Sequence, residues 1–424
     1  MKKVLIITYY WPPAGGPGVQ RWLKFVKYLP EFNIEPIVYI PENATYPLKD
    51  LKLQNDVSND LQIIKQPINE PYKIAALFSK KDTKTISAGI INDRKKQSLV
   101  QRLLLFIRGN FFIPDARIGW VNPSVAFLST YIKENNIDTI VTTGPPHSMH
   151  LIGLELQKKI ALKWIADFRD PWTSIGYHKE LKLTQSASKK HLQLEKNVLN
   201  SADTIITTSF TTKEEFQRLT QKPIHVITNG YDVENIEKPK LDTCFSMSHI
   251  GSLLSKRNPI ILWMVLEELI NEVATFKNDF KLKLIGKVSS EILESISKFN
   301  LQNNVEVIGY VSHSEALIYQ RSSQVLLLIE IDSHDTIGII PGKLFEYMAA
   351  ERPIIAIGPK GSDVEKIVYE TNTGTYFTYD QKEKLKQYII NGYSAYLNSN
   401  LKVNGIGLQY YSRKKLTESL AKIL

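Results

Sequence analysis

Short apolar runs alternate along the chain with longer segments in which apolar residues recur every three or four positions. The runs predict strands at residues 4–8, 34–40, 139–143, 163–166, 203–208, 224–228, 247–250, 281–285, 305–308, 325–330 and 353–357. The segments between them predict helices, with long examples at residues 124–136, 178–202, 260–273 and 412–423. Continuous apolar strands that alternate with helices are typical of parallel sheets covered on both faces, so the pattern predicts an α/β fold.

The length of the chain divides this pattern into domains. A chain of 424 residues is too long for one ordinary core, and the strand and helix pattern runs through two similar halves. We therefore expect a first domain over residues 1–235, a second over residues 236–408 and a C-terminal helix in residues 409–424. Open α/β sheets bind ligands at the carboxyl ends of their strands, so functional residues are expected in the loops that follow strands.

The loop and helix after residues 325–330 are the most informative of these segments. Pro341 and Gly342 open a helix whose first turn carries Lys343 and Glu346. Unpaired N–H groups and a lysine at a helix start favour an anion, and a carboxylate one turn later can accept hydrogen bonds from sugar hydroxyls. An amphipathic helix with solvated charges is the alternative interpretation of the same residues.

The sequence from Pro341 to Ala356, PGKLFEYMAAERPIIA, resembles the donor-binding motif of glycosyltransferase family 4. The resemblance implies a retaining enzyme with the GT-B fold, in which two doubly wound Rossmann-like domains face each other across a cleft and a C-terminal helix crosses back to the N-terminal domain. It also implies that Glu346 holds the ribose of a nucleotide sugar, although Gly338 stands where the family often has a second acid. The other donor-binding residues that it implies here are Pro341, Gly342, Leu344 and, in a segment that contacts the base, Tyr310.

A glycine-rich loop follows the first strand and contains Gly15, Gly16 and Gly18. Glycines let the backbone approach a ligand, and a strand, such a loop and a helix are the architecture of a phosphate or dinucleotide site. Arg21 occupies the third glycine position of the dinucleotide fingerprint and would obstruct its close packing, which disfavours a nicotinamide cofactor. The loop resembles the Pro-x-x-Gly-Gly loop of family 4, which implies acceptor contact at Gly15 and donor contact at Gly16.

A second loop of this kind begins the other half of the chain, with Gly251, two cations at Lys256 and Arg257, and then a helix. These features are typical of a phosphate site. In family 4 a basic residue of this loop pairs with the donor diphosphate, and Arg257 matches it best, with Lys256 one position off. The family tends to have an arginine where this chain has Ser252.

Two further loops of the first half carry polar residues at strand ends. His147 follows Gly-Pro-Pro after one strand, where it could do acid–base work or be structural. Asp167, Arg169 and Asp170 follow the next strand as an acid–arginine–acid cluster, for which a structural ion pair is the alternative. Both loops resemble acceptor-side segments of family 4, which implies a catalytic role for His147 and acceptor binding by the cluster.

Charge and composition limit the classes of partner that the protein is expected to bind. The net charge is +10, and residues 1–110 carry 17 Lys and Arg against 9 Asp and Glu, which indicates anionic partners. The basic, apolar segment of residues 100–114 could lie in an anionic membrane interface or form a core helix, and we favour the core. Cys244 is the single cysteine, as a reducing cytoplasm allows, and no apolar run approaches the length of a membrane span or matches a signal peptide.

The resemblance to family 4, together with these features, implies a retaining glycosyltransferase of cell-surface polysaccharide synthesis, which moves a sugar from a UDP- or GDP-sugar to a hydroxyl of a glycan or lipid-linked acceptor. No Asp-x-Asp motif or histidine cluster follows a strand, so we expect neither a metal nor a cofactor, and Arg257 and Lys343 would stabilise the leaving diphosphate. The expected location is the cytoplasm, at the inner face of the plasma membrane, with no nucleic-acid partner. A nucleotide-sugar-binding protein with a decayed site and an epimerase of the same fold are the alternatives. The domains are expected to close over the donor, with hinges near residues 229–240 and 406–412.

Overall fold

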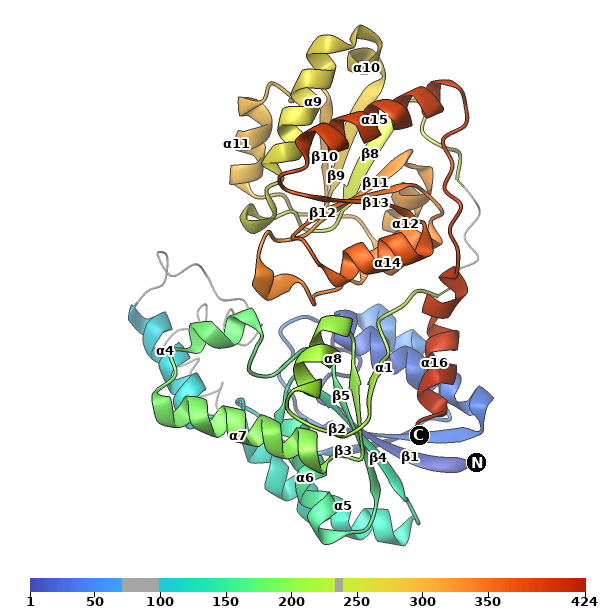
Figure 1. The fold of residues 1–424 in the computed structure, drawn as a ribbon. Helices are drawn as coiled ribbons and strands as arrows, with labels where there is room; N and C mark the ends of the chain where they lie inside the picture. The colour runs from blue at the N-terminus through green and yellow to red at the C-terminus, as the bar shows by residue number, and fades with distance from the viewer. Residues whose placement is uncertain (71–98, 233–238) are drawn as a thin grey trace. The chain divides into compact units, whose positions relative to one another are not determined.

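The computed structural model describes residues 1–70, 99–232 and 239–424, which fold into two compact units. Unit 1 consists of Met1–Thr228 and Arg413–Leu424, and unit 2 consists of Asn229–Ser412. The C-terminal helix α16 (Arg413–Ala421) therefore belongs to the same unit as the N-terminal strand (Figure 1). These limits place the first boundary before residue 235 and the second after residue 408.

Unit 1 is built on a seven-stranded sheet of parallel neighbours in the order β3-β2-β1-β4-β5-β6-β7. Its strands are β1 (Lys2–Ile7), β2 (Ile34–Pro41), β3 (Gln62–Gln66), β4 (Thr139–Gly144), β5 (Lys163–Phe168), β6 (Thr204–Thr207) and β7 (Ile224–Val226). Its other helices are α1 (Pro17–Tyr28), α4 (Leu99–Phe111), α5 (Val121–Glu134), α6 (Ser148–Lys159), α7 (Gln185–Ser201) and α8 (Phe210–Gln217). The strand order reverses between β1 and β4, and doubly wound sheets bind their ligands at such a switch point.

Successive residues of β1 enter two different hydrophobic cores, because side chains alternate across a strand. Leu5 and Ile7 pack into one core, whereas Val4 and Ile6 pack into the other, beside Trp22 of α1. Helix α16 lies against α1 on this second face of the sheet (Figure 1). The continuous apolar run of β1 is thus explained by burial on both faces.

Unit 2 repeats this plan with a six-stranded parallel sheet in the order β10-β9-β8-β11-β12-β13. Its strands are β8 (Phe245–Ile250), β9 (Phe280–Ile285), β10 (Val305–Gly309), β11 (Val325–Ile329), β12 (Ile354–Gly358) and β13 (Gly374–Thr378). Its helices are α9 (Ile260–Glu272), α10 (Ala274–Asp279), α11 (Ser290–Lys298), α12 (His313–Ser322), α13 (Lys343–Ala349), α14 (Asp363–Thr371) and α15 (Lys382–Leu397). The switch point lies between β8 and β11. The predicted α/β class with two doubly wound, Rossmann-like sheets is confirmed.

Two elements of unit 1 differ from the sequence prediction. The helix expected over residues 178–202 is a 3₁₀ turn at Gly176–Leu181 followed by α7, which begins only at Gln185. Lys182 has a left-handed φ of 51°, and the Thr184 side chain caps the first turn of α7, so the helix starts there. Strand β3 is not predicted because it is an edge strand with only two apolar residues and no buried one.

The segment of residues 100–114, for which we favoured the core, is only partly buried. In helix α4, Leu105 is buried and packs with Leu181, whereas Leu103 and Phe111 are 59% and 72% exposed. The core interpretation therefore applies to one face of the helix only. Among the residues that the structure describes, no helix is long and apolar enough to cross a membrane.

Candidate active site

Two glycines shape the carboxyl end of β8 in unit 2. Gly251 has a φ of 115° and Gly286 a φ of 123°, and residues other than glycine rarely adopt such values. A Cβ on Gly286 would lie 2.6 Å from the carbonyl oxygen of Gly251, so their loops approach as closely as glycine permits. A Cβ on Gly251 would lie 3.1 Å from Nζ of Lys343, so the predicted glycine loop and the predicted lysine meet at one place.

The side chain of Lys343, the first residue of α13, interacts with three other residues of unit 2. Its Nζ lies 3.2 Å from Nε2 of His249, a buried residue of β8. Burial and the positive charge of Arg257 lower the pKa of Lys343 to about 7, and Glu346 opposes the shift. An anion that bound beside this amine would favour its charged form.

Arg257, in the loop after β8, is the second cation of this site. It lies in a 3₁₀ turn, Ser255–Arg257, two positions before Pro259, which forms the N-cap of α9. The Arg257 side chain is half-buried, whereas that of the predicted Lys256 is exposed. Since Arg257 lowers the pKa of Lys343, the two cations share one site.

Glu330, directly after β11, is a buried acid that the sequence analysis did not single out. Its carboxylate accepts hydrogen bonds from the hydroxyls of Ser362 at 3.0 Å and Tyr376 at 2.8 Å. Burial raises the pKa of Glu330 to about 7, against these hydrogen bonds and the charge of Arg257. The available signal was an acid at the carboxyl end of a buried strand, which is where such sheets bind ligands.

The remaining predicted donor residues divide by exposure. Glu346 is half-buried, and its Oε2 accepts a hydrogen bond of 2.9 Å from Nε2 of Gln320 in α12. Leu344, in contrast, has no exposed surface, so its side chain packs inside unit 2, and its contact with a donor stays a prediction for its backbone. Pro341 and Gly342 before α13, Ser252 after β8 and Tyr310 after β10 all keep exposed surface.

In unit 1, Asp167 at the end of β5 is engaged inside the protein. Its unexposed carboxylate accepts hydrogen bonds from Trp22 Nε1 at 2.7 Å, Thr143 Oγ1 at 2.8 Å and Arg21 Nη2 at 3.0 Å. Burial opposes the charge, but Arg21 and these hydrogen bonds lower the pKa of Asp167 below its usual value. Arg21, which occupies the third glycine position of the dinucleotide fingerprint, thus connects α1 to the end of β5. The geometry supports the structural alternative for Asp167.

Arg169 joins the two loops at the switch point of unit 1. Its guanidinium donates to the backbone carbonyls of Gly144 and Pro145, and a Cβ on Gly18 would lie 1.6 Å from its Nη1. A side chain at position 18 would therefore displace the guanidinium, which fills this space. Burial lowers the pKa of Arg169 and raises that of Asp170, and each group opposes the shift of the other. Of the predicted acceptor-side residues, Asp170 is the one that no described residue supplies with a hydrogen bond.

His147, just before α6, is enclosed. It is 4% exposed, and its ring stacks on Trp172 with centroids 5.0 Å apart. Neither ring nitrogen has a hydrogen-bond partner among the described residues, and burial, followed by nearby His150, lowers the pKa of His147 well below its usual range. An imidazole that is enclosed and holds a proton this weakly is poorly suited to acid–base work, so this arrangement favours the structural alternative for His147.

The two predicted glycines of the first loop have different surroundings. Gly15 donates its N–H to the carbonyl of Leu48 at 3.0 Å, and a Cβ on Gly15 would lie 3.2 Å from the side chains of Leu48 and Asp50. Gly16 has a φ of 108°, and a Cβ there would meet no described atom within 4 Å. Gly16 is therefore required by its backbone conformation and leaves space beside the switch point.

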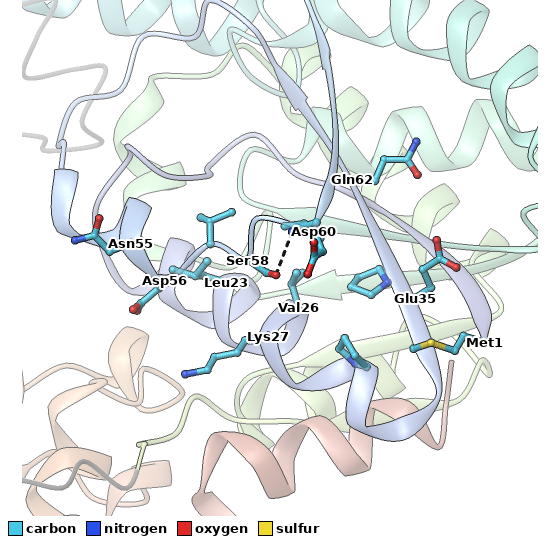
Figure 2. A pocket seen from close by; sticks show the side chains of 14 residues that line it. Met1, Leu23, Val26, Lys27, Glu35, Asn55, Asp56, Ser58, Asp60 and Gln62 are labelled. Atoms are coloured by element: carbon cyan, nitrogen blue, oxygen red, sulfur yellow. Dashed lines mark hydrogen bonds between the residues drawn. The ribbon is translucent and has the colours of Figure 1, made fainter.

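A pocket of about 490 Å³ in unit 1 lies away from this switch point (Figure 2). It opens at the amino ends of β2 and β3, where Glu35 and Gln62 line it together with Lys27 and Asp60. None of the predicted site residues lines it, so we do not assign it to the active site. In the described parts of the chain, no three His, Cys, Asp or Glu side chains form a group that could hold a metal ion.

Comparison with known proteins defines the class of the protein. The family model described as Glycosyltransferase Family 4 matches residues 91–235, and the one described as Glycosyl transferases group 1 matches residues 247–394. No curated protein matches the chain. The two Rossmann-like sheets and the two family matches define a glycosyltransferase of GT-B architecture. The chain belongs to the family 4 type of these enzymes.

Solved structures share the fold at low sequence identity. A glycosyltransferase from Rickettsia africae is 15% identical with a TM-score of 0.58, and the match covers 100% of this chain and 93% of that one. The lipopolysaccharide outer core galactosyltransferase WaaB is 13% identical with a TM-score of 0.59, covering 100% and 99%. HepE from Anabaena, solved with UDP and glucose, is 14% identical with a TM-score of 0.59, also covering 100% and 99%.

Proposed function

We propose that this glycosyltransferase is a retaining, metal-independent enzyme of cell-surface polysaccharide synthesis. It transfers a sugar from a UDP- or GDP-sugar, bound by unit 2, to a hydroxyl of a glycan or lipid-linked acceptor. The observation that carries the proposal is a pair of cations at the switch point of unit 2: Lys343, whose amine lies beside Gly251, and Arg257, whose charge acts on Lys343. Two cations that share one site suit a diphosphate better than a neutral ligand.

In the proposed reaction, these cations stabilise the departing nucleotide. The bond between the anomeric carbon and the diphosphate breaks, and a bond forms on the same face between that carbon and the acceptor oxygen. The acceptor proton goes to an oxygen of the leaving diphosphate. Because negative charge grows on the diphosphate, cations fixed beforehand beside Gly251 lower the barrier, which is the task of a divalent metal in other phosphate chemistry.

The other predicted residues take binding roles in this proposal. Glu346, held by Gln320, accepts hydrogen bonds from the ribose hydroxyls of the donor. In unit 1, Asp170 binds the acceptor, because its carboxylate receives no hydrogen bond from the described residues and a sugar hydroxyl could supply one. His147 and Asp167 are assigned no chemical step.

Several structures with this fold support the donor and acceptor classes. HepE from Anabaena was solved with UDP-glucose, and Staphylococcus aureus TarM with UDP and a GlcNAc-glycerol. WaaB is described as a lipopolysaccharide outer core galactosyltransferase. These ligands and activities belong to those proteins, and they make UDP-sugars the first donors to test here.

A donor screen followed by an activity assay tests the proposal. Thermal unfolding of the full chain with UDP-, GDP- and ADP-sugars identifies the donor, because a ligand that binds the native state raises the unfolding temperature. We expect nucleotide release from that donor only with an acceptor present, unchanged by EDTA, and NMR of the product should show the donor's anomeric configuration. Binding without release would indicate a decayed site, an epimerised sugar without acceptor would indicate an epimerase, and an inverted product would exclude retention.

A further inference from the structure

His249 is a buried residue that contacts the proposed donor site but has no role in the mechanism above. It lies in β8, two positions before Gly251, and is 1% exposed. Its Nδ1 lies 3.1 Å from the carbonyl oxygen of Leu327 in β11, and its Nε2 lies 3.2 Å from Nζ of Lys343 in α13. The imidazole therefore connects both strands of the switch point to the proposed diphosphate-binding lysine.

The partners of His249 determine where its proton lies. A carbonyl oxygen can only accept, so the contact with Leu327 requires the hydrogen on Nδ1. Burial, followed by the charge of Lys343, lowers the pKa of His249 well below its usual range, against hydrogen bonds to the backbone of Leu327 and Ser252, so the ring is neutral and carries one hydrogen. Its Nε2 is then a lone-pair acceptor, and Lys343 is the donor of the 3.2 Å contact.

We propose that His249 is a positioning residue, whose Nε2 accepts one N–H of Lys343 and thereby directs the other N–H groups of this amine to the donor diphosphate beside Gly251. The inference rests on the proposed function. A lysine amine carries three donors on a flexible four-carbon stem, and an acceptor on a buried ring fixes it before the ligand arrives.

A neutral acceptor suits this task better than an acid would. A carboxylate at the position of His249 would pair with Lys343 and compete with the diphosphate for its charge. An imidazole lone pair holds one N–H and leaves the positive charge to the ligand. The acid that does act on Lys343, Glu346, is itself held by Gln320 in α12.

Two substitutions separate the two hydrogen bonds of the ring. His249→Asn keeps a donor near the position of Nδ1 for Leu327 but has no acceptor for Lys343, whereas His249→Gln can place an oxygen near the position of Nε2. Calorimetry on the full chain would measure the affinities of UDP and GDP, with UMP and GMP as controls that lack the second phosphate. We expect His249→Asn to weaken binding of the diphosphate about tenfold, to leave the monophosphate unchanged, and His249→Gln to restore most of the loss.

A double-mutant cycle shows whether the effect passes through Lys343. The His249→Asn substitution should weaken diphosphate binding in the wild type but not in a Lys343→Ala background, because the group that it positions is then missing. Equal losses in both backgrounds, or equal losses for UDP and UMP, would show a merely structural role and overturn the inference. Such an outcome would leave the proposed function intact, whereas a wild type that binds neither UDP nor GDP would overturn both.

The wild-type protein supplies a test that does not depend on a variant that folds. ¹⁵N NMR of the chain labelled at histidine reports which ring nitrogen carries the hydrogen. We expect His249 to show a protonated Nδ1 and an unprotonated Nε2 from pH 6 to pH 8, and we expect the Nε2 signal to shift when UDP or GDP is added. A hydrogen on Nε2 would exclude it as the acceptor for Lys343 and overturn the inference.

Discussion

Single residues of the unit 2 site carry charges that burial partly suppresses. Lys343 and Glu330 have opposite charges when ionised, and burial brings the pKa of each to about 7. Near pH 7, both groups are therefore partly neutral before a ligand binds. Arg257 adds a second basic side chain to the same site. A diphosphate arriving at such a site would draw protons onto Lys343 and restore its charge.

The first residue-scale prediction separates catalytic from binding contacts. We expect Arg257→Ala and Lys343→Ala each to lower kcat on the order of 10²- to 10³-fold, because each removes a charge that stabilises the departing diphosphate. Glu346→Ala should mainly raise KM for the donor, since ribose contacts are the same before and during the reaction. Steady-state kinetics with donor varied, with the exposed Lys298→Ala in α11 as control, would measure this. Near-normal kcat in both cation variants would contradict the mechanism.

The second prediction concerns pH. Folding lowers the pKa of Lys343 from 10.5 to about 7, so the unfolded chain binds more protons between these values and this group makes the free energy of unfolding rise with pH there. Diphosphate binding prefers the charged amine, so the affinity for UDP or GDP should fall as pH rises through about 7.

Lys343→Arg is the matched control, because its charge persists at every pH while the nucleotide and Glu330 titrate as before. Calorimetry between pH 6 and pH 9 should show a smaller fall for this variant than for the wild type. Equal falls would assign the pH dependence to Glu330, whose pKa is also about 7, and not to Lys343.

At the scale of elements, one glycine at the start of α1 sets the position of a loop after another strand. Gly18→Ala would place a Cβ 1.6 Å from Nη1 of Arg169, so the guanidinium must leave the carbonyls of Gly144 and Pro145. We expect a loss of about 1–3 kcal/mol in the free energy of unfolding, as for other overpacked sites. The rate of amide hydrogen exchange should increase in the loop that follows β4. Gly176→Ala, where a Cβ meets no described atom within 4 Å, should change neither quantity.

Helix α4 presents apolar side chains that the described part of unit 1 does not cover. Leu103 and Phe111 are exposed, and residues 1–110 have an excess of positive charge. We expect the protein to sediment with anionic liposomes at low salt and to be released at high salt. Each basic residue near the membrane surface should contribute about 1 kcal/mol to the free energy of binding. Leu103→Ser with Phe111→Ser should abolish sedimentation, whereas Leu397→Ser, at an exposed position of α15, should not. No binding at low salt would refute the membrane prediction and leave the enzyme class untouched.

How far the sequence predicts each element depends on how local its cause is. The buried strands were predictable because both faces of strands such as β1 are apolar, and the PGK segment placed Lys343 correctly at a helix start. The position of Arg257, in contrast, depends on a cap at Pro259. The role of His249 depends on neighbours 78 and 94 positions away, Leu327 and Lys343, which no local pattern reveals.

At the scale of the whole molecule, the chain passes between the two units twice, and both passages lie in one place. The units meet in sequence at Thr228 and at Ser412. Close to these points, the N–H of Tyr231 donates to the carbonyl of Tyr411 at 3.1 Å, and the Tyr231 hydroxyl donates to the carbonyl of Leu408 at 3.1 Å. Paired connections of this kind can act as one hinge, because a few residues absorb the change in backbone angles.

We therefore expect the two units to close when the donor binds, with rotation at these paired segments. Small-angle scattering of the full chain should show a smaller radius of gyration at saturating nucleotide sugar, whichever UDP- or GDP-sugar the thermal screen selects. Closure needs a ligand that binds the closed form more tightly than the open one, so UMP or GMP, which lack the second phosphate, should produce less compaction. Lys343→Ala should also reduce the compaction at equal occupancy, since it removes a contact to that phosphate. An unchanged scattering profile at saturating donor would contradict closure while leaving the assignment of the donor site to unit 2 in place.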